Sequence, residues 1–265
     1  MTSTPETSDL EALLAPIPGP DPAGAELRYA PIYDRIRAAR RAADDKQQGK
    51  SASGGEDDKL SPEERASAAR EYWLAVQSLI RDVLASQSKD LQLAVWLLEA
   101  EAYINGFTGA ANVFGLIKRL LETYWDTFHP PVEEDDEPLA LRAGVMEWLN
   151  DRLPLIFKSI PLSSGARKYS LADYELTQRT TDEASKAELI AAGRPSPEQF
   201  AQAMSSSSAE HLGAMAGQVD TCLAQLIELE SVTDLRFATH VVSFGAVRKA
   251  LEDCQFQVGR ALRAK

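Results

Sequence analysis

Residues 86–109 read SQSKDLQLAVWLLEAEAYINGFTG, and this stretch decides the fold. Its apolar side chains recur at spacings of three and four residues, which places them on one face of an α-helix. Those side chains are Leu91, Ala94, Val95, Leu98 and Ala102. Ser88 is suited to cap this helix, and Lys89 and Asp90 suit an ion pair in its first turn. Asn105-Gly106 provides a left-handed stop.

The helical period continues on both sides of this stretch, and no segment alternates convincingly with a period of two. Further helices are predicted over 31–43, 61–86 and 109–126, and another begins at Pro138. All four tryptophans fall within 61–152, namely Trp73, Trp96, Trp125 and Trp148. We therefore predict an all-α protein whose best-defined core lies in an N-terminal domain covering 1–161.

The composition changes after Pro161. Residues 162–207 are polar and predict a connecting region with short helices, whereas 208–265 predicts a helical hairpin. The hairpin has two apolar seams with matching steps of three and four, which either pack within one chain or pair with a second copy. We favour packing within one chain, and we assign any self-association to this same region. The candidate residues, called the seam residues below, are Leu212, Met215, Val219, Leu226, Phe244 and Leu251.

Composition and charge narrow the class of protein and of partner. The 265 residues carry a net charge of −12, which argues against a nucleic-acid backbone or an anionic membrane as the main partner and favours a protein surface. No apolar run approaches the roughly 20 residues that cross a bilayer, and no secretory signal is visible. The two cysteines fit a reducing compartment. We expect a cytoplasmic protein.

Catalytic readings of the sequence are weak. Ser86 and Lys89 have the S-x-x-K spacing of serine acyl-enzymes, but the S-D-N and K-T-G companions of such enzymes do not occur. Gly49-Lys50-Ser51 resembles the end of a phosphate loop, yet Asp44 stands where that motif needs glycine. Glu99 lies near the apolar face of its helix, and we expect it to pair with an arginine such as Arg142. We predict no enzyme.

Metal and cofactor sites are not predicted either. His129, His211 and His240 are isolated in the sequence, and the cysteines have no ligand-like spacing. The acidic run Glu133, Glu134, Asp135, Asp136 and Glu137 lacks the alternating ligands and the glycine of a calcium loop. Flanking prolines favour its projection outward, so we predict a solvated loop that is a candidate for contact with a partner.

Seven blocks in this order resemble the N-terminal ImpA/TssA domain of type VI secretion systems. The resemblance spans about 13–160, and KYSLADYEL at 168–176 resembles the segment that follows that domain. The blocks are PIPGPDPAGAELRY, the Trp73 helix, SKDLQLAVWLLEA, NGFTG, YWDTFHP, the acidic run, and LRAGVMEWL. Within them the residues that we take as the family signature and core, called the signature residues below, are Trp73, Ser88, Lys89, Asp90, Leu98, Gly106, Trp125, His129, Pro130, Arg142 and Trp148.

The resemblance implies an all-helical, non-enzymatic assembly factor. Proteins of this family are associated with the baseplate and the growing contractile tail, so sheath, tube, spike or baseplate components are the implied partners. Family members usually continue into a C-terminal domain that builds a ring, and we therefore expect a short relative or a fragment. The alternative is an unrelated helical scaffold or regulator that dimerises through its C-terminal helices.

Overall fold

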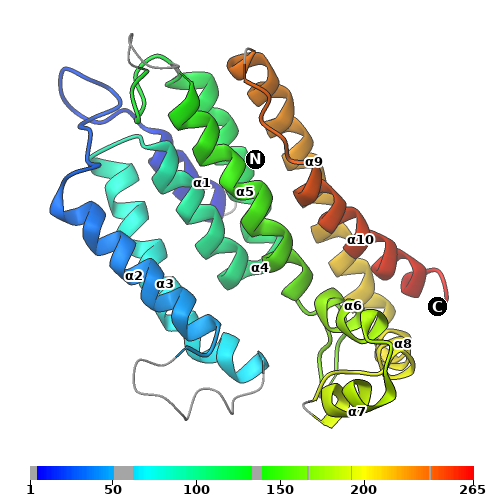
Figure 1. Cartoon of the computed structure of the whole chain (residues 1–265). Coiled ribbons are helices and arrows are strands. Elements are labelled where there is room, and N and C mark those ends of the chain that lie inside the picture. The colour runs from blue at the N-terminus through cyan, green and yellow to red at the C-terminus, as the bar shows by residue number, and fades with distance from the viewer. Residues whose placement is uncertain (1–4, 51–61, 133–138, 166, 192, 239) are drawn as a thin grey trace.

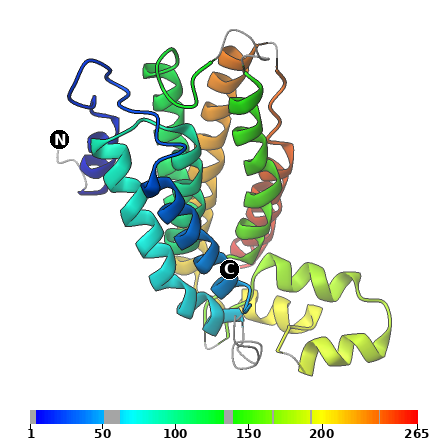
Figure 2. The same cartoon turned by 60° about the vertical axis from the view of Figure 1, so that its left-hand side comes forward.

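The computed structural model describes residues 5–50, 62–132, 139–165, 167–191, 193–238 and 240–265. These residues form helices and no strand, which confirms the predicted all-α class (Figures 1 and 2). The helices are α1 (Pro5–Leu14), α2 (Pro31–Gln47), α3 (Pro62–Ser86), α4 (Leu91–Thr123), α5 (Ala140–Ser159), α6 (Leu171–Arg179), α7 (Glu183–Ala191), α8 (Pro197–Ser206), α9 (Ala209–Phe237) and α10 (Gly245–Leu262). No helix in these ranges combines the length and the apolar character that crossing a membrane requires.

The longest helix, α4, folds back on itself at Gly106. A straight helix of its 33 residues would be about 50 Å long. Its two ends nevertheless lie close together, because the amide of Leu91 donates to the carbonyl of His129, five residues after Tyr124. Gly106 makes the reversal, with φ 60° and ψ −140°. The predicted stop at Asn105-Gly106 is confirmed, although the second limb begins directly after it.

The two parts of α4, before and after Gly106, approach each other very closely. A Cβ atom on Gly109 would lie 2.5 Å from the carbonyl oxygen of Glu101 and 2.8 Å from the Cβ of Asn105. Glycine is therefore needed twice within four residues, once for its backbone conformation and once for its lack of a side chain.

The long helices form a bundle whose connecting loops gather at its two ends (Figure 1). Loops 15–30, 87–90, 124–132 and 240–244 lie together, and we call this region the loop end. The short helices α6, α7 and α8 lie at the opposite end, where residues 162–207 predicted short helices. One apolar cluster runs through the bundle from Leu13 to Val258.

The seam residues are not available for the predicted self-association. The five seam residues other than Met215 are at most 3% exposed, and Met215 is partly buried. They are covered within the chain, since α9 packs along α4 and α10 packs against both α5 and α9 (Figure 2). The favoured alternative, packing within one chain, is confirmed. The same core therefore joins the segments predicted as an N-terminal domain (1–161) and a hairpin (208–265).

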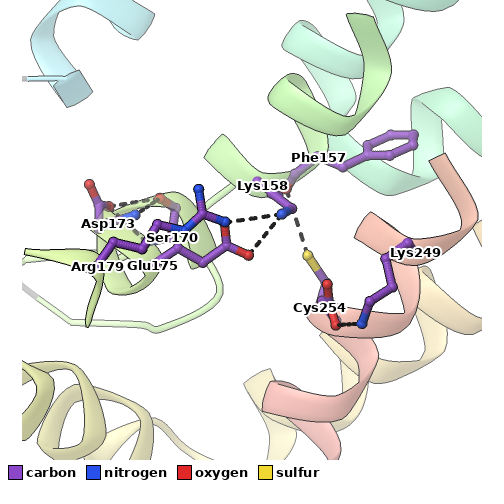
Figure 3. Close-up of polar contacts among 9 residues, drawn as sticks. Phe157, Lys158, Ser170, Asp173, Glu175, Arg179, Lys249 and Cys254 are labelled. Atoms are coloured by element: carbon purple, nitrogen blue, oxygen red, sulfur yellow. Dashed lines mark hydrogen bonds and ion pairs between the residues drawn. The ribbon is translucent and has the colours of Figure 1, made fainter. Parts of the chain in front are cut away.

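Polar contacts attach α6 to the end of the bundle (Figure 3). Lys158 on α5 donates to both carboxylate oxygens of Glu175 on α6, at 2.8 and 3.0 Å. Ser170 and Asp173 form a capping box at the start of α6. In the same region, the thiol of Cys254 on α10 lies 3.8 Å from the carbonyl oxygen of Phe157. Burial raises the pKa of Cys254 to about 12, so this thiol stays protonated and packs as a small apolar group.

Gly106→Ala tests the reversal of α4. Its φ and ψ lie where only glycine is comfortable, so alanine should lower the free energy of unfolding by about 1–3 kcal/mol. Gly213→Ala is the control, because Gly213 lies inside α9 with open space around it. That variant should be neutral or gain about 0.5–1 kcal/mol of stability. Urea denaturation of both variants decides the matter, and equal effects would contradict the assigned reversal.

Candidate functional site

The structure divides the signature residues into two groups. The first group lies along the bundle and comprises Trp73, Leu98, Gly106 and Trp148. Trp73 stacks on Tyr103 with ring centroids 4.6 Å apart, and the guanidinium of Arg40 lies 4.8 Å from the ring centroid of Trp148. Leu98 is fully buried, and Gly106 reverses the direction of α4. The second group gathers at the loop end and comprises Ser88, Lys89, Asp90, Trp125, His129, Pro130 and Arg142. This second group is the candidate functional site.

Lys89 is a fully buried cation at this site. Its Nζ donates to the carbonyl oxygens of Leu13 at 2.7 Å and Leu84 at 2.6 Å. These carbonyls belong to the last turns of α1 and α3, which have no partner inside their own helices. Burial lowers the pKa of Lys89 to about 8, so it remains charged at neutral pH. The predicted ion pair between Lys89 and Asp90 is therefore wrong: the charge is satisfied by two helix ends.

Arg142 is the second buried cation of the site, 1% exposed. Its guanidinium donates to three main-chain carbonyls of the 124–132 loop, those of Trp125 at 2.7 Å, Phe128 at 2.8 Å and Pro130 at 2.8 Å. It also lies 4.0 Å from the centroid of the Phe128 ring. Burial lowers the pKa of Arg142 to about 10, which leaves it protonated. One side chain thus fixes the course of this loop.

The prediction that Glu99 pairs with an arginine is confirmed, although the partners are Arg40 and Arg152 and not Arg142, which was named as an example. Glu99 is fully buried between α2 and α5, where it accepts from Arg40 and, at 2.7 Å, from Arg152. Arg152 also pairs with Asp44 on α2. This ionic cluster joins α2, α4 and α5, and it lies along the bundle rather than at the loop end. Sequence spacing gave no signal for it, because its members come from three separate helices.

Main-chain hydrogen bonds complete the loop end. The amide of Lys89 donates to Ala23 at 2.6 Å, and the amide of Ala25 donates to Gln87 at 3.0 Å. On the other side, Lys89 accepts from the amide of His129 at 2.9 Å. The 87–90 loop is therefore the central strand-like segment to which the other two loops are bonded.

Asp90, rather than Ser88, caps α4. Its Oδ1 accepts from the amide of Leu93 at 3.0 Å, whereas Ser88 is buried with no hydrogen-bond partner for its Oγ among the described residues. Burial raises the pKa of Asp90 to about 6, against smaller lowering effects from the Leu93 amide and from His129. The prediction placed the cap two residues too early because serine and aspartate are equally good caps.

A small cleft of about 60 Å³ opens beside these residues. It is lined by Glu26, Arg28, Tyr33, Asp90, Gln92, His129, Pro130, Leu141 and Val145. Around this part of the loop end, Tyr29 is 89% exposed, Leu141 46% and Val132 42%. Pockets that hold a whole small-molecule ligand usually measure about 300–1,000 Å³. The cleft is therefore too small to hold a whole small-molecule ligand. A larger cavity of about 570 Å³ lies beside α6–α8, and none of the signature residues lines it.

The geometry gives no support to the S-x-x-K reading. The Oγ of Ser86 donates to the carbonyl of Asp82 at 2.7 Å, while Lys89 is directed into the interior. The described part of the chain contains no group of three or more histidine, cysteine, aspartate or glutamate side chains able to hold a metal ion. The acidic run 133–137, predicted as a partner-contact loop, lies outside the described residues.

Comparison with known proteins matches the chain to one family. The family model described as ImpA, N-terminal, type VI secretion system, matches residues 14–151, a range that includes every signature residue. The type VI secretion system component TssA1 of Pseudomonas aeruginosa is 26% identical over 225 residues, which cover 84% of this chain and 60% of that protein. The chain thus matches about 60% of the length of this relative.

A solved structure is similar over almost the whole chain. It is the N-terminal domain, including the conserved ImpA_N region, of the TssA component of the type VI secretion system from Burkholderia cenocepacia. The TM-score is 0.79 at 28% sequence identity, and the match covers 99% of this chain and 96% of that one. The likeness therefore includes α9 and α10, which lie beyond the range of the family model.

Lys89→Met tests the buried cation while preserving most of the side-chain volume. The carbonyls of Leu13 and Leu84 would lose their donor, and we expect a loss of about 1–3 kcal/mol of stability for each. Lys249→Met is the control, since Lys249 lies on the surface of α10, where it pairs with the partly exposed Asp253 of the same helix. Chemical denaturation should show no measurable change for the control. A Lys89→Met variant as stable as the control would refute the role assigned to Lys89.

Asp90→Asn tests the buried carboxyl through the pH dependence of stability. Its folded pKa of about 6 lies above the ordinary value of 3.8. The stabilising contribution of the protonated carboxyl is thus fully present below about pH 4 and is lost as the pH rises through about 6. Asparagine keeps the cap and does not titrate, so the variant should lack this fall and at pH 7 gain up to about 3 kcal/mol. Identical pH profiles for the two proteins, from thermal unfolding between pH 4 and 7, would contradict this assignment.

Proposed function

The chain belongs to the ImpA/TssA family of type VI secretion systems, and from this membership we propose that it is a non-enzymatic docking component that links the baseplate and the contractile tail during assembly. The proposed partners are sheath, tube, spike or baseplate proteins. Neither nucleic acid nor membrane insertion forms part of the proposed role.

The observation that supports this proposal is what the two buried cations of the site, Lys89 and Arg142, bind. Lys89 and Arg142 both bind main-chain carbonyls of loops and helix ends, not carboxylates or a reacting group. Such an arrangement fixes the backbone of a surface. A rigid surface binds a protein partner with a smaller loss of conformational entropy.

The surface held in this way also has the composition of a docking site. Tyr29, Leu141 and Val132 are exposed at the loop end, and Leu141 also lines the cleft. Tyrosine is one of the residues that most often dominate binding energy between proteins, and exposed apolar side chains add area that a partner can cover. The alternative, a scaffold that dimerises through α9 and α10, would have to use other residues of these helices, because the seam residues are buried within the chain.

Binding to purified partners tests the proposal. Sheath, tube, spike and baseplate proteins of the same secretion system should be titrated with the full chain, and at least one should bind. Replacing both Tyr29 and Leu141 by alanine should weaken that binding by about tenfold, as expected for central contacts. The control replaces Leu155 and Phe256, which are 65% and 58% exposed on α5 and α10, and should leave affinity unchanged. Binding to none of the four classes would refute the docking role.

A further inference from the structure

The connection between α9 and α10 contains a short extended segment, residues 241–244. It has no helix, turn or bend, and it runs along the outside of the bundle (Figure 2). Val241 and Ser243 are exposed, Val241 to 90%. Val242 and Phe244 are buried in the common core. Alternation with a period of two is that of a β-strand. The segment therefore lies on the bundle as a single strand, held by every second side chain.

The main-chain groups of this segment are not hydrogen-bonded within the chain. The amides and carbonyls of residues 241–243 make no hydrogen bond with any residue that the structure describes. The start of α10 does not use them, because the amides of Ala246 and Val247 donate instead to Asn150 on α5, at 2.8 and 3.3 Å. Since buried main-chain groups are nearly always paired, we take these unpaired groups to face water along the exposed side of the segment.

The other loops of the loop end are joined to one another through their main chains. Gly24 forms a β-bridge with Ser88, and Asp90 forms one with His129. Residues 241–243 take part in no such bridge with the described part of the chain, although their side chains alternate as in a strand. An unpaired strand edge is a template to which an extended segment of another chain can add.

We propose that residues 241–243 bind an extended segment of a protein partner, which pairs with their main chain as an added strand. The free amides and carbonyls supply the hydrogen bonds, and Val241 offers an apolar side chain for the partner segment to cover. A second copy of the chain is disfavoured as the occupant, since each copy carries a net charge of −12 and the two would repel each other. The inference rests on the proposed function, because it names how the docking protein recognises part of its partner.

A strand-forming peptide tests the inference directly. The probe is a short acetylated peptide in which valine and threonine alternate between two terminal lysines, titrated into the full chain with isotope-labelled valine. We expect saturable NMR shifts of the amides of Val241 and Val242, and no shift at Val258, which is buried in α10. The same peptide with its central amides N-methylated cannot donate along either edge, and it should bind at least about tenfold more weakly. Equal responses to the two peptides, or no response at Val241 and Val242, would overturn the inference.

Ser243→Pro removes one amide donor from the segment, and proline fits an extended backbone. The variant should weaken binding of the alternating peptide by at least about tenfold. Ser243→Ala is the matched control: like proline it lacks the hydroxyl that accepts from the amide of Gly245 at 3.2 Å, but it keeps its own main-chain amide. It should bind as tightly as the wild type. Equal binding by the two variants would contradict the assigned edge. Thermal unfolding shows whether both variants keep the fold, and the N-methylated peptide tests the same bonds without altering the chain.

The same variants separate this inference from the proposed function. If a secretion-system protein binds the wild-type chain and Ser243→Pro with equal affinity, the added strand is wrong although the docking role stands. If none of those proteins binds while the alternating peptide still shifts the amides of Val241 and Val242, the docking role fails and the strand pairing stands.

Discussion

The structure depends on two buried cations that bind main-chain carbonyls. Lys89 joins the ends of α1 and α3, and Arg142 holds three carbonyls of the loop that precedes α5. Burying a charge without an opposite charge is costly, and it is tolerated here because carbonyl dipoles supply the compensation. Both groups stay protonated at neutral pH, so neither is free to act as a base. Their contacts fix the 124–132 loop and the junction of α1, α3 and the 87–90 loop.

The remainder of the fold serves to present that end. The reversal at Gly106 brings both ends of α4 to it, so that Asp90 and Tyr124 lie near each other although 34 residues separate them in sequence. Glu99 and its two arginines then join α2 to α5 across the first limb of α4. Together these contacts fix the long helices relative to one another at the base of the loop end.

Much of the fold, but less of the site, could be predicted from the sequence. Gly106 and the faces of α3 and α9 have local signals, namely a turn residue and a helical period, and the structure agrees with them. The cap at Asp90 was misplaced to Ser88 because local preference does not separate two good caps. An arginine partner for Glu99 could be predicted, but its identity could not, and neither could the carbonyls that Lys89 binds, since contacts between distant segments leave no periodic trace. The seam residues are buried partly because α9 packs on α4 and α10 packs on α5. The periodic pattern of α9 and α10 cannot predict this packing, since it does not indicate which other helices cover the seams.

Amide hydrogen exchange tests most directly the claim that the signature cations hold the loop end for docking. In the wild-type chain the amides of Ala25, Lys89, Leu91 and His129, which bond the three loops together, should be protected almost as well as those of the bundle core. Arg142→Lys keeps the charge but loses the fork that binds three carbonyls. In this variant the four amides should lose protection by at least about tenfold while the core amides change little. Unchanged protection at all four amides would contradict the account.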